Sequence, residues 1–164
     1  MKKILLIAAI AVFGFTSVQA QEGGVKVGLT VALPMGDAGD ISTFGAGLDV
    51  AYLANVADSF LVGAATGYQH FFGKTETIAG FEIEFDDVQF IPIAAAARFD
   101  LDGLFFGADL GYALGVNDGN DGGFYYRPKI GYSFGNISLL ASYIGVSLEN
   151  TSWTSVGLGV EFGF

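Results

Sequence analysis

The chain ends in the sequence WTSVGLGVEFGF, residues 153–164, and this stretch decides how the rest is interpreted. Counted back from the end, every second residue is apolar and those between are small or polar: Phe164, Phe162, Val160, Leu158 and Val156 alternate with Gly163, Glu161, Gly159, Gly157 and Ser155. A period of two places the two sets on opposite faces of a β-strand. Transmembrane β-strands present such an apolar face to lipid, with aromatic residues at the boundary with water. The stretch therefore predicts a membrane-facing strand.

The first twenty residues have the composition of a secretory signal peptide. Lys2 and Lys3 precede an apolar run over residues 4–15, and a polar stretch follows that ends at Ala20. The apolar run is shorter than the roughly 20 residues that a membrane-spanning helix needs. We therefore predict export with cleavage after Ala20, so that residues 1–20 are a signal peptide and residues 21–164 form one domain.

The mature chain is acidic, apolar and free of cysteine. All seventeen acids remain after cleavage but only five of the seven bases, which argues against a nucleic-acid partner. The lack of cysteine excludes a disulfide framework and a lipid-anchored lipoprotein. Hydrophobic residues make up 52% of the chain, yet the longest apolar run beyond the signal peptide covers only residues 90–97. We therefore expect the apolar residues to be spread over many alternating strands.

The mature sequence divides into eight predicted strands with alternating long and short connections. The predicted strands cover residues 24–33, 43–54, 60–72, 88–99, 104–116, 124–134, 137–148 and 153–164. The longer connections are residues 34–42, 73–87, 117–123 and 149–152. Long loops at one rim and short turns at the other are typical of bacterial outer-membrane barrels. The predicted fold is therefore all-β: an eight-stranded antiparallel transmembrane up-and-down β-barrel, with both termini at the short-turn rim.

Several features of the pattern predict local detail. Pro92 and Pro128 lie within strands and each removes a ladder hydrogen bond, so we expect a bulge at each. Ile144 and Val146 break the phase of the strand over residues 137–148, which predicts a bulge or a shifted register there. Two aromatic girdles are expected, one of Tyr52, Phe60, Phe99, Phe106, Phe134, Phe162 and Phe164, the other of Phe44, Tyr68, Phe72, Tyr126 and Trp153.

The charged residues of the strands all fall on the face opposite the apolar one. We expect a polar network inside the barrel, made of Lys26, Asp49, Gln69, Arg98, Asp109, Arg127, Lys129 and Glu161. An eight-stranded barrel is just wide enough for its side chains to fill it. Isolated buried charges are costly whereas networked charges are tolerated, so the expected role of this network is structural.

The chain resembles a known family in its length, signal peptide, strand count, loop asymmetry and the ending Val160-Glu161-Phe162-Gly163-Phe164. It is similar, over residues 21–164, to the small bacterial outer-membrane β-barrels of the OmpX and OmpA membrane-domain type, a porin-like family. The resemblance implies a monomer in the outer membrane with a filled interior and no large pore, both termini in the periplasm and long loops outside the cell. It also implies contact with outer-membrane lipid and lipopolysaccharide. Finally, it implies that Val160, Phe162 and Phe164 belong to the signal read by the barrel-assembly machinery, after delivery by periplasmic chaperones.

Residues 81–87, FEIEFDD, are the candidate surface-loop contact. Glu82, Glu84 and Asp86 alternate with Phe81, Ile83 and Phe85. A row of carboxylates can bind hard cations that bridge to lipid phosphates, but it more often forms a solvated face, which is the interpretation we favour. The apolar residues opposite could instead offer an edge to a partner strand.

No catalytic site, metal site or cofactor is predicted. His70 is the only histidine, and its neighbours Gln69, Phe71 and Phe72 supply neither the serine nor the acid of a catalytic triad. We therefore expect a non-enzymatic outer-membrane barrel with a structural or surface-loop-binding role. The alternatives are a secreted soluble β-barrel that binds a small apolar ligand, an outer-membrane lipid-modifying enzyme and a narrow diffusion pore.

Overall fold

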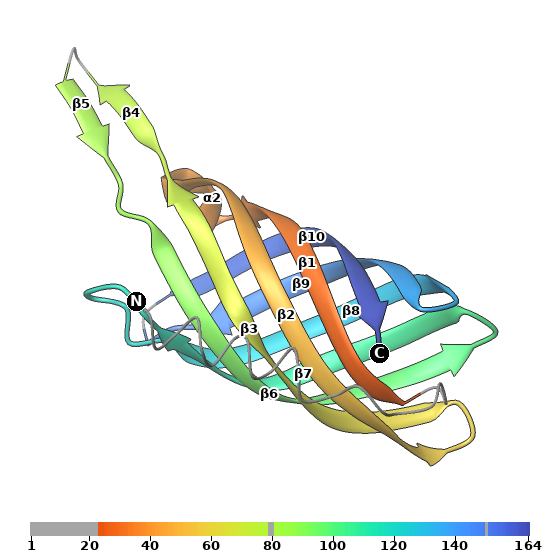
Figure 1. The fold of residues 1–164 in the computed structure, drawn as a ribbon. Coiled ribbons are helices and arrows are strands. Elements are labelled where there is room, and N and C mark those ends of the chain that lie inside the picture. The colour runs from red at the N-terminus through yellow and green to blue at the C-terminus, as the bar shows by residue number, and fades with distance from the viewer. Residues whose placement is uncertain (1–22, 79–80, 150) are drawn as a thin grey trace, which may run out of the picture.

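The computed structural model describes residues 23–78, 81–149 and 151–164, so the predicted signal peptide, residues 1–20, lies outside the described residues. The barrel strands are β1 (Gly24–Met35), β2 (Ser42–Ala57), β3 (Phe60–Gly73), β6 (Val88–Leu101), β7 (Leu104–Gly115), β8 (Gly123–Phe134), β9 (Ile137–Ser147) and β10 (Ser152–Gly163). They form a closed barrel in which every neighbouring pair is antiparallel and β1 pairs with β10 (Figure 1). The predicted eight-stranded antiparallel barrel is therefore confirmed.

Short turns and long loops alternate around the barrel as expected. Residues 58–59, 102–103 and 135–136 form the turns of what we call the short-turn rim. At the turn over residues 102–103 both residues have positive φ, 48° for Asp102 and 94° for Gly103, as a tight hairpin turn requires. The opposite end, which we call the long-loop rim, carries residues 36–41, 74–87, 116–122 and 148–151.

Two of the long loops contain regular structure. The first holds the short helix α2 (Asp37–Ile41), which the sequence pattern did not predict. The second holds β4 (Thr75–Ile78) and β5 (Phe81–Glu84), an antiparallel hairpin that extends well beyond the barrel (Figure 1). The barrel thus carries one projecting element at the long-loop rim.

The predicted bulges at the two prolines are wrong. The β6–β7 register passes through Pro92, and the β7–β8 register passes through Pro128, without a shift. On its other side each proline interrupts the ladder, which then resumes in the same register. A strand residue directs its N–H toward only one neighbouring strand, so a proline disrupts the ladder on one side and leaves the register intact. The hydroxyl of Thr66 also donates to the Pro92 carbonyl at 2.8 Å.

The predicted irregularity in β9 is also wrong. The pairing of β9 with β10 runs from Ser147 and Ser152 to Ile137 and Phe162 without a shift. Ile144 and Val146 keep the inward phase, and their side chains are 1% and 0% exposed. They looked out of phase because the interior was expected to be polar along its whole length.

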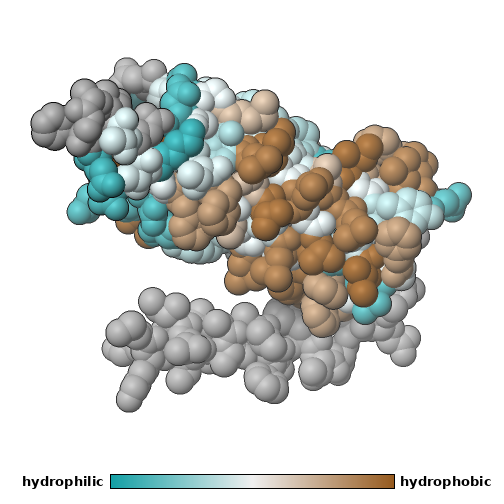
Figure 2. All heavy atoms as spheres, turned by 90° about the horizontal axis from the view of Figure 1, so that it is seen from above, coloured by the Kyte–Doolittle hydropathy of each residue, from teal (hydrophilic) through white to brown (hydrophobic). Residues whose placement is uncertain are grey.

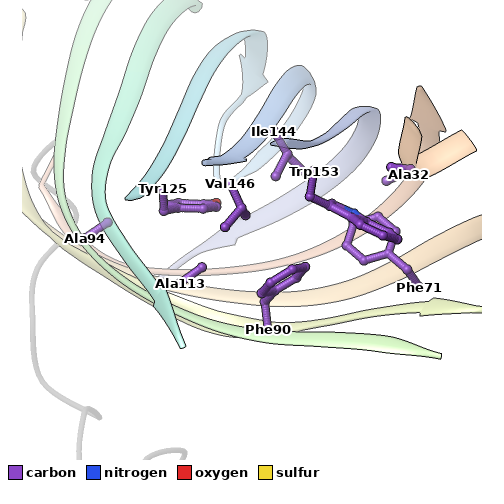
Figure 3. Packing of buried hydrophobic residues seen from close by; sticks show 10 residues of the cluster. Ala32, Phe71, Phe90, Ala94, Ala113, Tyr125, Ile144, Val146 and Trp153 are labelled. Carbon is purple, nitrogen blue, oxygen red and sulfur yellow. The ribbon is translucent and has the colours of Figure 1, made fainter. Parts of the chain in front are cut away.

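The half of the interior next to the long-loop rim is apolar instead. The plug, as we call this buried cluster, consists of Ala32, Ala38, Phe71, Phe90, Ala94, Ala113, Tyr125, Ile144, Val146 and Trp153 (Figure 3). The Trp153 ring packs against Phe71 at 5.2 Å and Phe90 at 6.1 Å between centroids. Ala38 of α2 is 1% exposed, so this helix closes the outer end of the plug.

The plug corrects the placement of Trp153, which was expected in an aromatic girdle. Its side chain points inward because it shares the phase of Glu161, eight residues later on the same strand. Alternation along β10 therefore outweighs the preference of tryptophan for a membrane interface.

The outside of the barrel is apolar. Leu29, Val31, Ile93, Leu110 and Leu158 are between 53% and 67% exposed. In the described barrel strands the outward positions hold no Asp, Glu, Lys or Arg. Figure 2 shows hydrophobic residues gathered over the barrel body and hydrophilic residues toward the long-loop rim. An apolar surface of this extent indicates contact with lipid.

No helix within the described residues is long and apolar enough to cross a membrane.

Gly111 and Gly47 provide a matched test of how tightly the interior is packed. A Cβ on Gly111 would overlap the Ile93 carbonyl and the Ala94 Cα, whereas the atom nearest a Cβ on Gly47 would be 3.5 Å away. We expect G111A to lower the free energy of unfolding by about 1–3 kcal/mol. G47A should cause no loss, because glycine within a strand is itself about 0.5–1 kcal/mol less stable than alanine.

The measurement is guanidinium unfolding in detergent micelles, followed by the fluorescence of Trp153, the only tryptophan in the chain. Equal stability of the two variants would contradict the close strand packing at Gly111.

Candidate functional site

The middle of the barrel interior is crossed by an ion pair between Arg127 of β8 and Asp49 of β2. The Arg127 Nη1 lies 2.7 Å from the Asp49 Oδ1, and the Nη2 donates to the Thr30 hydroxyl at 2.9 Å. That hydroxyl donates in turn to the Asp49 Oδ2 at 2.6 Å, which closes the triangle. Strands β2 and β8 are diametrically opposite in the barrel order, so this pair braces the two walls against each other.

A second pair crosses the interior nearer the short-turn rim, between Arg98 of β6 and Glu161 of β10. The two atoms Nη1 and Oε1 are 2.7 Å apart, and β6 and β10 are again opposite strands. The Arg98 Nε donates to Asp100 at 3.0 Å and the Nη2 to Ser133 at 2.8 Å. Its Cζ lies 3.5 Å from the centroid of the Phe105 ring. Every nitrogen of this guanidinium therefore has a partner, and its face is covered by an aromatic ring.

The other predicted network residues are placed as follows. Lys129 pairs with Asp109 of the adjacent strand at 2.9 Å. Gln69 donates to the Tyr125 hydroxyl at 3.4 Å, which joins the network to the plug. Lys26 faces the same interior, but among the described residues no carboxylate lies within ion-pair distance of it. All eight residues share the interior, and six of them form three ion pairs.

Sequence reasoning missed part of this network. It did not single out Asp100, whose carboxylate raises the count of interior acids to four, equal to the four interior bases. It also missed Thr30, Ser133 and Tyr125, although all of them occupy inward-phase positions. Phase alone would have identified them, but which of them contact a charge depends on how the barrel closes.

The interior is filled rather than open. The cavities that remain between these side chains measure about 20 Å³ beside Arg127 and about 10 Å³ beside Arg98. A cavity needs about 10–15 Å³ to hold one water molecule. Within the described protein, Asp109 Oδ1 and Arg127 Nε have no hydrogen-bond partner, and both residues line the larger cavity. The space therefore suits isolated bridging waters and not a continuous channel.

The β4–β5 hairpin places the predicted surface-loop residues outside the barrel. Glu82 and Glu84 pair across the hairpin with Thr77 and Thr75, so these four residues share one side of it. Glu82, Glu84, Asp86 and Ile83 are exposed, with Ile83 at 41%, and Phe85 is half-buried. The side chain of Phe81 lies outside the described part of the structure. No group of three or more His, Cys, Asp or Glu side chains placed to hold a metal ion occurs among the described residues.

His70 has an acidic partner that local sequence did not reveal. Its Nε2 lies 2.9 Å from the Oδ2 of Asp87, and its Nδ1 lies 3.2 Å from the Tyr68 hydroxyl. The backbone N–H of Gly73 also donates to the Asp87 carboxylate at 2.9 Å. This hydrogen bond, followed by the contact with His70, holds the pKa of Asp87 below its usual value. The expectation that His70 lacks an acid is therefore wrong, because the hairpin brings Asp87 back beside it.

The C-terminal residues lie where the barrel closes. Phe162 and Phe164 are 38% and 66% exposed on the outside, and Val160 is half-buried. The Phe164 N–H donates to the Val25 carbonyl at 2.9 Å, so the last residue extends the β1–β10 pairing.

The Arg127–Asp49 pair can be tested by removing one or both partners. We expect R127M and D49L each to lower the free energy of unfolding by about 3–5 kcal/mol, because each leaves a buried charge without its partner. The double variant should be more stable than either single one, since no uncompensated charge remains. Trp153 fluorescence during guanidinium unfolding provides the measurement, with the exposed D118N as control. Additive losses in the double variant would show that the two side chains are not coupled.

Solved structures share this architecture at low sequence identity. Ail of Yersinia pestis, in a phospholipid bilayer nanodisc, is 16% identical with a TM-score of 0.62, over 87% of this chain and 100% of Ail. A crystal structure of Ail gives a TM-score of 0.57 at 14% identity, over 87% of this chain and 97% of that one. Neisserial surface protein A gives 0.52 at 18% identity, over 90% and 100%.

No protein-family model and no curated protein matches the sequence. The likeness therefore lies in the fold and hardly in the residues themselves. The chain has the fold of the small eight-stranded β-barrels of the bacterial outer membrane.

Proposed function

We propose that this chain is an integral outer-membrane protein whose sealed barrel presents a binding surface at the long-loop rim. The observation that carries the proposal is the contrast between the two parts of the molecule. The interior is closed by ion pairs and by the plug, while the β4–β5 hairpin projects from the barrel and exposes the acidic Glu82 and Glu84 and the apolar Ile83. Binding residues often lie on loops that a rigid scaffold positions, and the hairpin on this barrel has that arrangement.

The proposed orientation has the long-loop rim outside the cell and the short-turn rim in the periplasm. In bacterial outer-membrane barrels the periplasmic turns are short and the extracellular loops are longer. The turns over residues 58–59, 102–103 and 135–136 are short, and both ends of the described barrel lie beside them. The same arrangement directs the hairpin outward.

The proposed partners follow from the outer surface. Its uncharged, apolar body supports outer-membrane lipid as a partner. Lipopolysaccharide is proposed as the lipid beside the long-loop rim, because that rim is proposed to face outward. Recognition of Val160, Phe162 and Phe164 by the barrel-assembly machinery, after periplasmic chaperones, is supported by their position along the closing strand. A monomer is proposed because one chain closes the barrel by itself.

A non-catalytic role is part of the proposal. The contacts that His70 makes support it. Within the described residues these are a carboxylate, a tyrosine hydroxyl and an aromatic ring, and none of them is a serine. A triad needs a nucleophile within hydrogen-bond reach of the base. The ion-paired and plugged interior likewise weighs against a ligand-binding soluble barrel and against a diffusion pore.

Cysteine labelling of whole cells tests the orientation, since the chain contains no cysteine of its own. We expect a membrane-impermeant maleimide to label I83C, because Ile83 is 41% exposed on the hairpin. D102C, at a turn of the short-turn rim, should be labelled only after the outer membrane is permeabilised. Labelling of D102C in intact cells with protection of I83C would reverse the proposed orientation.

Replacement of residues 75–84 by an Asn-Gly turn tests the binding role. The shortened protein should assemble normally, because the barrel strands and the residues at the hairpin base are unchanged. Both proteins are placed in nanodiscs and exposed to the medium in which the source bacterium has grown. The full-length protein should retain a molecule from this medium that the shortened protein does not retain. The triple variant E82Q/I83S/E84Q keeps the hairpin length and should lose the same species. Equal retention by all three proteins would contradict a hairpin-based function.

A further inference from the structure

The base of the β4–β5 hairpin is fastened to the barrel by a chain of hydrogen bonds centred on His70. Gly73 is the last residue of β3 before the hairpin, and Asp87 is the last residue before β6. The Asp87 carboxylate accepts the Gly73 N–H through Oδ1 and contacts the His70 Nε2 through Oδ2, both at 2.9 Å. It therefore ties together the two legs of the hairpin and attaches them to the outer face of β3.

Every hydrogen-bond donor and acceptor in this set of contacts has a partner when the His70 ring carries two protons. An ionised carboxylate can only accept, so the Nε2 must bear a hydrogen. The Tyr68 hydroxyl donates its one hydrogen to the Gln89 Oε1 at 2.9 Å. Its oxygen can then accept from the His70 Nδ1, 3.2 Å away, when that nitrogen bears a hydrogen as well. A ring with hydrogens on both nitrogens is the imidazolium cation.

The neutral ring keeps these contacts only if neighbouring groups turn. With a hydrogen on Nε2 alone, the Tyr68 hydroxyl would have to turn toward Nδ1 and leave Gln89, unless the Gln89 amide turned with it. The attraction between the positive ring and the Asp87 carboxylate would also be lost. The charged ring is therefore the form with the stronger hold on Asp87.

We propose that His70 is a proton-operated clip: its charged ring holds the base of the hairpin closed, and loss of the proton loosens it. This inference rests on the proposed function of the hairpin as a binding surface, whose presentation the clip would regulate. The effect is local, because the pairings of β3 with both neighbouring strands keep one register from His70 to Leu61.

The surroundings of the ring leave few other groups that could control it. The ionisable groups in contact with it are Tyr68 and Asp87, and its cross-strand neighbours Ala46 and Gln89 carry no charge. The Phe72 ring lies 4.4 Å from the His70 ring between centroids.

The clip also connects two loops. The backbone N–H of Gln89 donates to the Asn117 side chain at 3.0 Å, and the Gln89 carbonyl accepts from the Asn120 side chain at 3.0 Å. Val116 donates to the same carbonyl at 3.1 Å. Gln89 is thus the point at which the hairpin base and the loop over residues 116–122 are joined, and a change at His70 reaches both.

The direction of the pH dependence follows from which form the closed clip prefers. The contact between His70 and Asp87 is an ion pair only while the ring carries its second proton, so the clip weakens as the pH rises and that proton is lost. Histidine side chains generally change charge between about pH 5 and about pH 8. At the acid end the clip persists, since Asp87 has a lowered pKa and stays ionised below the range usual for a carboxyl group.

The experiment uses the folded protein in detergent micelles and needs no ligand. Because the chain has one histidine, the ring nitrogen signals in an NMR titration report on His70 alone. We expect both ring nitrogens to be protonated at the acid end of the titration. Exchange protection of the Gly73 and Phe85 amides, corrected for intrinsic exchange at each pH, should fall about 2- to 5-fold as the ring titrates.

Three variants separate the clip from ordinary pH effects. H70Q and D87N should both abolish the step in protection, and D87N should keep part of the basal protection because its amide oxygen still accepts the Gly73 N–H. E84Q removes an exposed carboxylate from the same hairpin and should leave the step unchanged. A step that survives in H70Q or D87N, or no step in the unmodified protein, would overturn the proposal.

The outcome is independent of the binding test. A step in protection with no species retained by the hairpin would leave the clip standing and remove the binding function. Retention by the hairpin without a step would leave the binding function standing and remove the clip.

Discussion

The antiparallel pairing of β1 with β10 is the contact on which the rest of the structure depends. A sheet in contact with hydrocarbon must satisfy its backbone N–H and C=O groups internally, and a closed sheet has no edge that could fail to do so. Ten residue pairs join the two strands, from Lys26 with Gly163 to Met35 with Thr154. Once this seam is closed, an inside and an outside exist, and the alternation of each strand assigns every side chain to one of them.

Closure then determines how the interior is used. An eight-stranded barrel leaves space for side chains only. The two arginine pairs, Arg127 with Asp49 and Arg98 with Glu161, each join opposite walls of the barrel. The backbone hydrogen bonds of the sheet, in contrast, join only neighbouring strands. The plug occupies the half nearer the long-loop rim, capped by α2. Along the barrel axis, the half nearer the long-loop rim is therefore apolar. The half nearer the short-turn rim holds the ion pairs beside a smaller apolar cluster of Leu53, Leu61 and Ala96, and neither half provides a passage.

The long-loop rim lies beyond the closed part of the barrel and carries exposed polar side chains. There the chain is no longer required to alternate between lipid and interior, and the hairpin can expose Glu82 and Glu84 beside Thr75 and Thr77. The link between the rigid wall and this projection is a small set of polar side chains around His70 and Gln89. A few hydrogen bonds at the surface, rather than the many that hold the barrel, decide how the projection is held.

The sequence by itself determined the eight strands, their connections and the face of most strand residues, with Trp153, Ile144 and Val146 as exceptions, because these depend on a period of two that is local to each strand. Only the tertiary structure decided which side chains meet. Asp49 and Arg127 are 78 residues apart and touch because closure places β2 opposite β8. Trp153, Ile144 and Val146 follow the inward phase, but this end of the interior is seen to be apolar only when the residues that seven strands and α2 place there are brought together. Asp87 reaches His70 because a hairpin folds back, and no periodicity encodes that return.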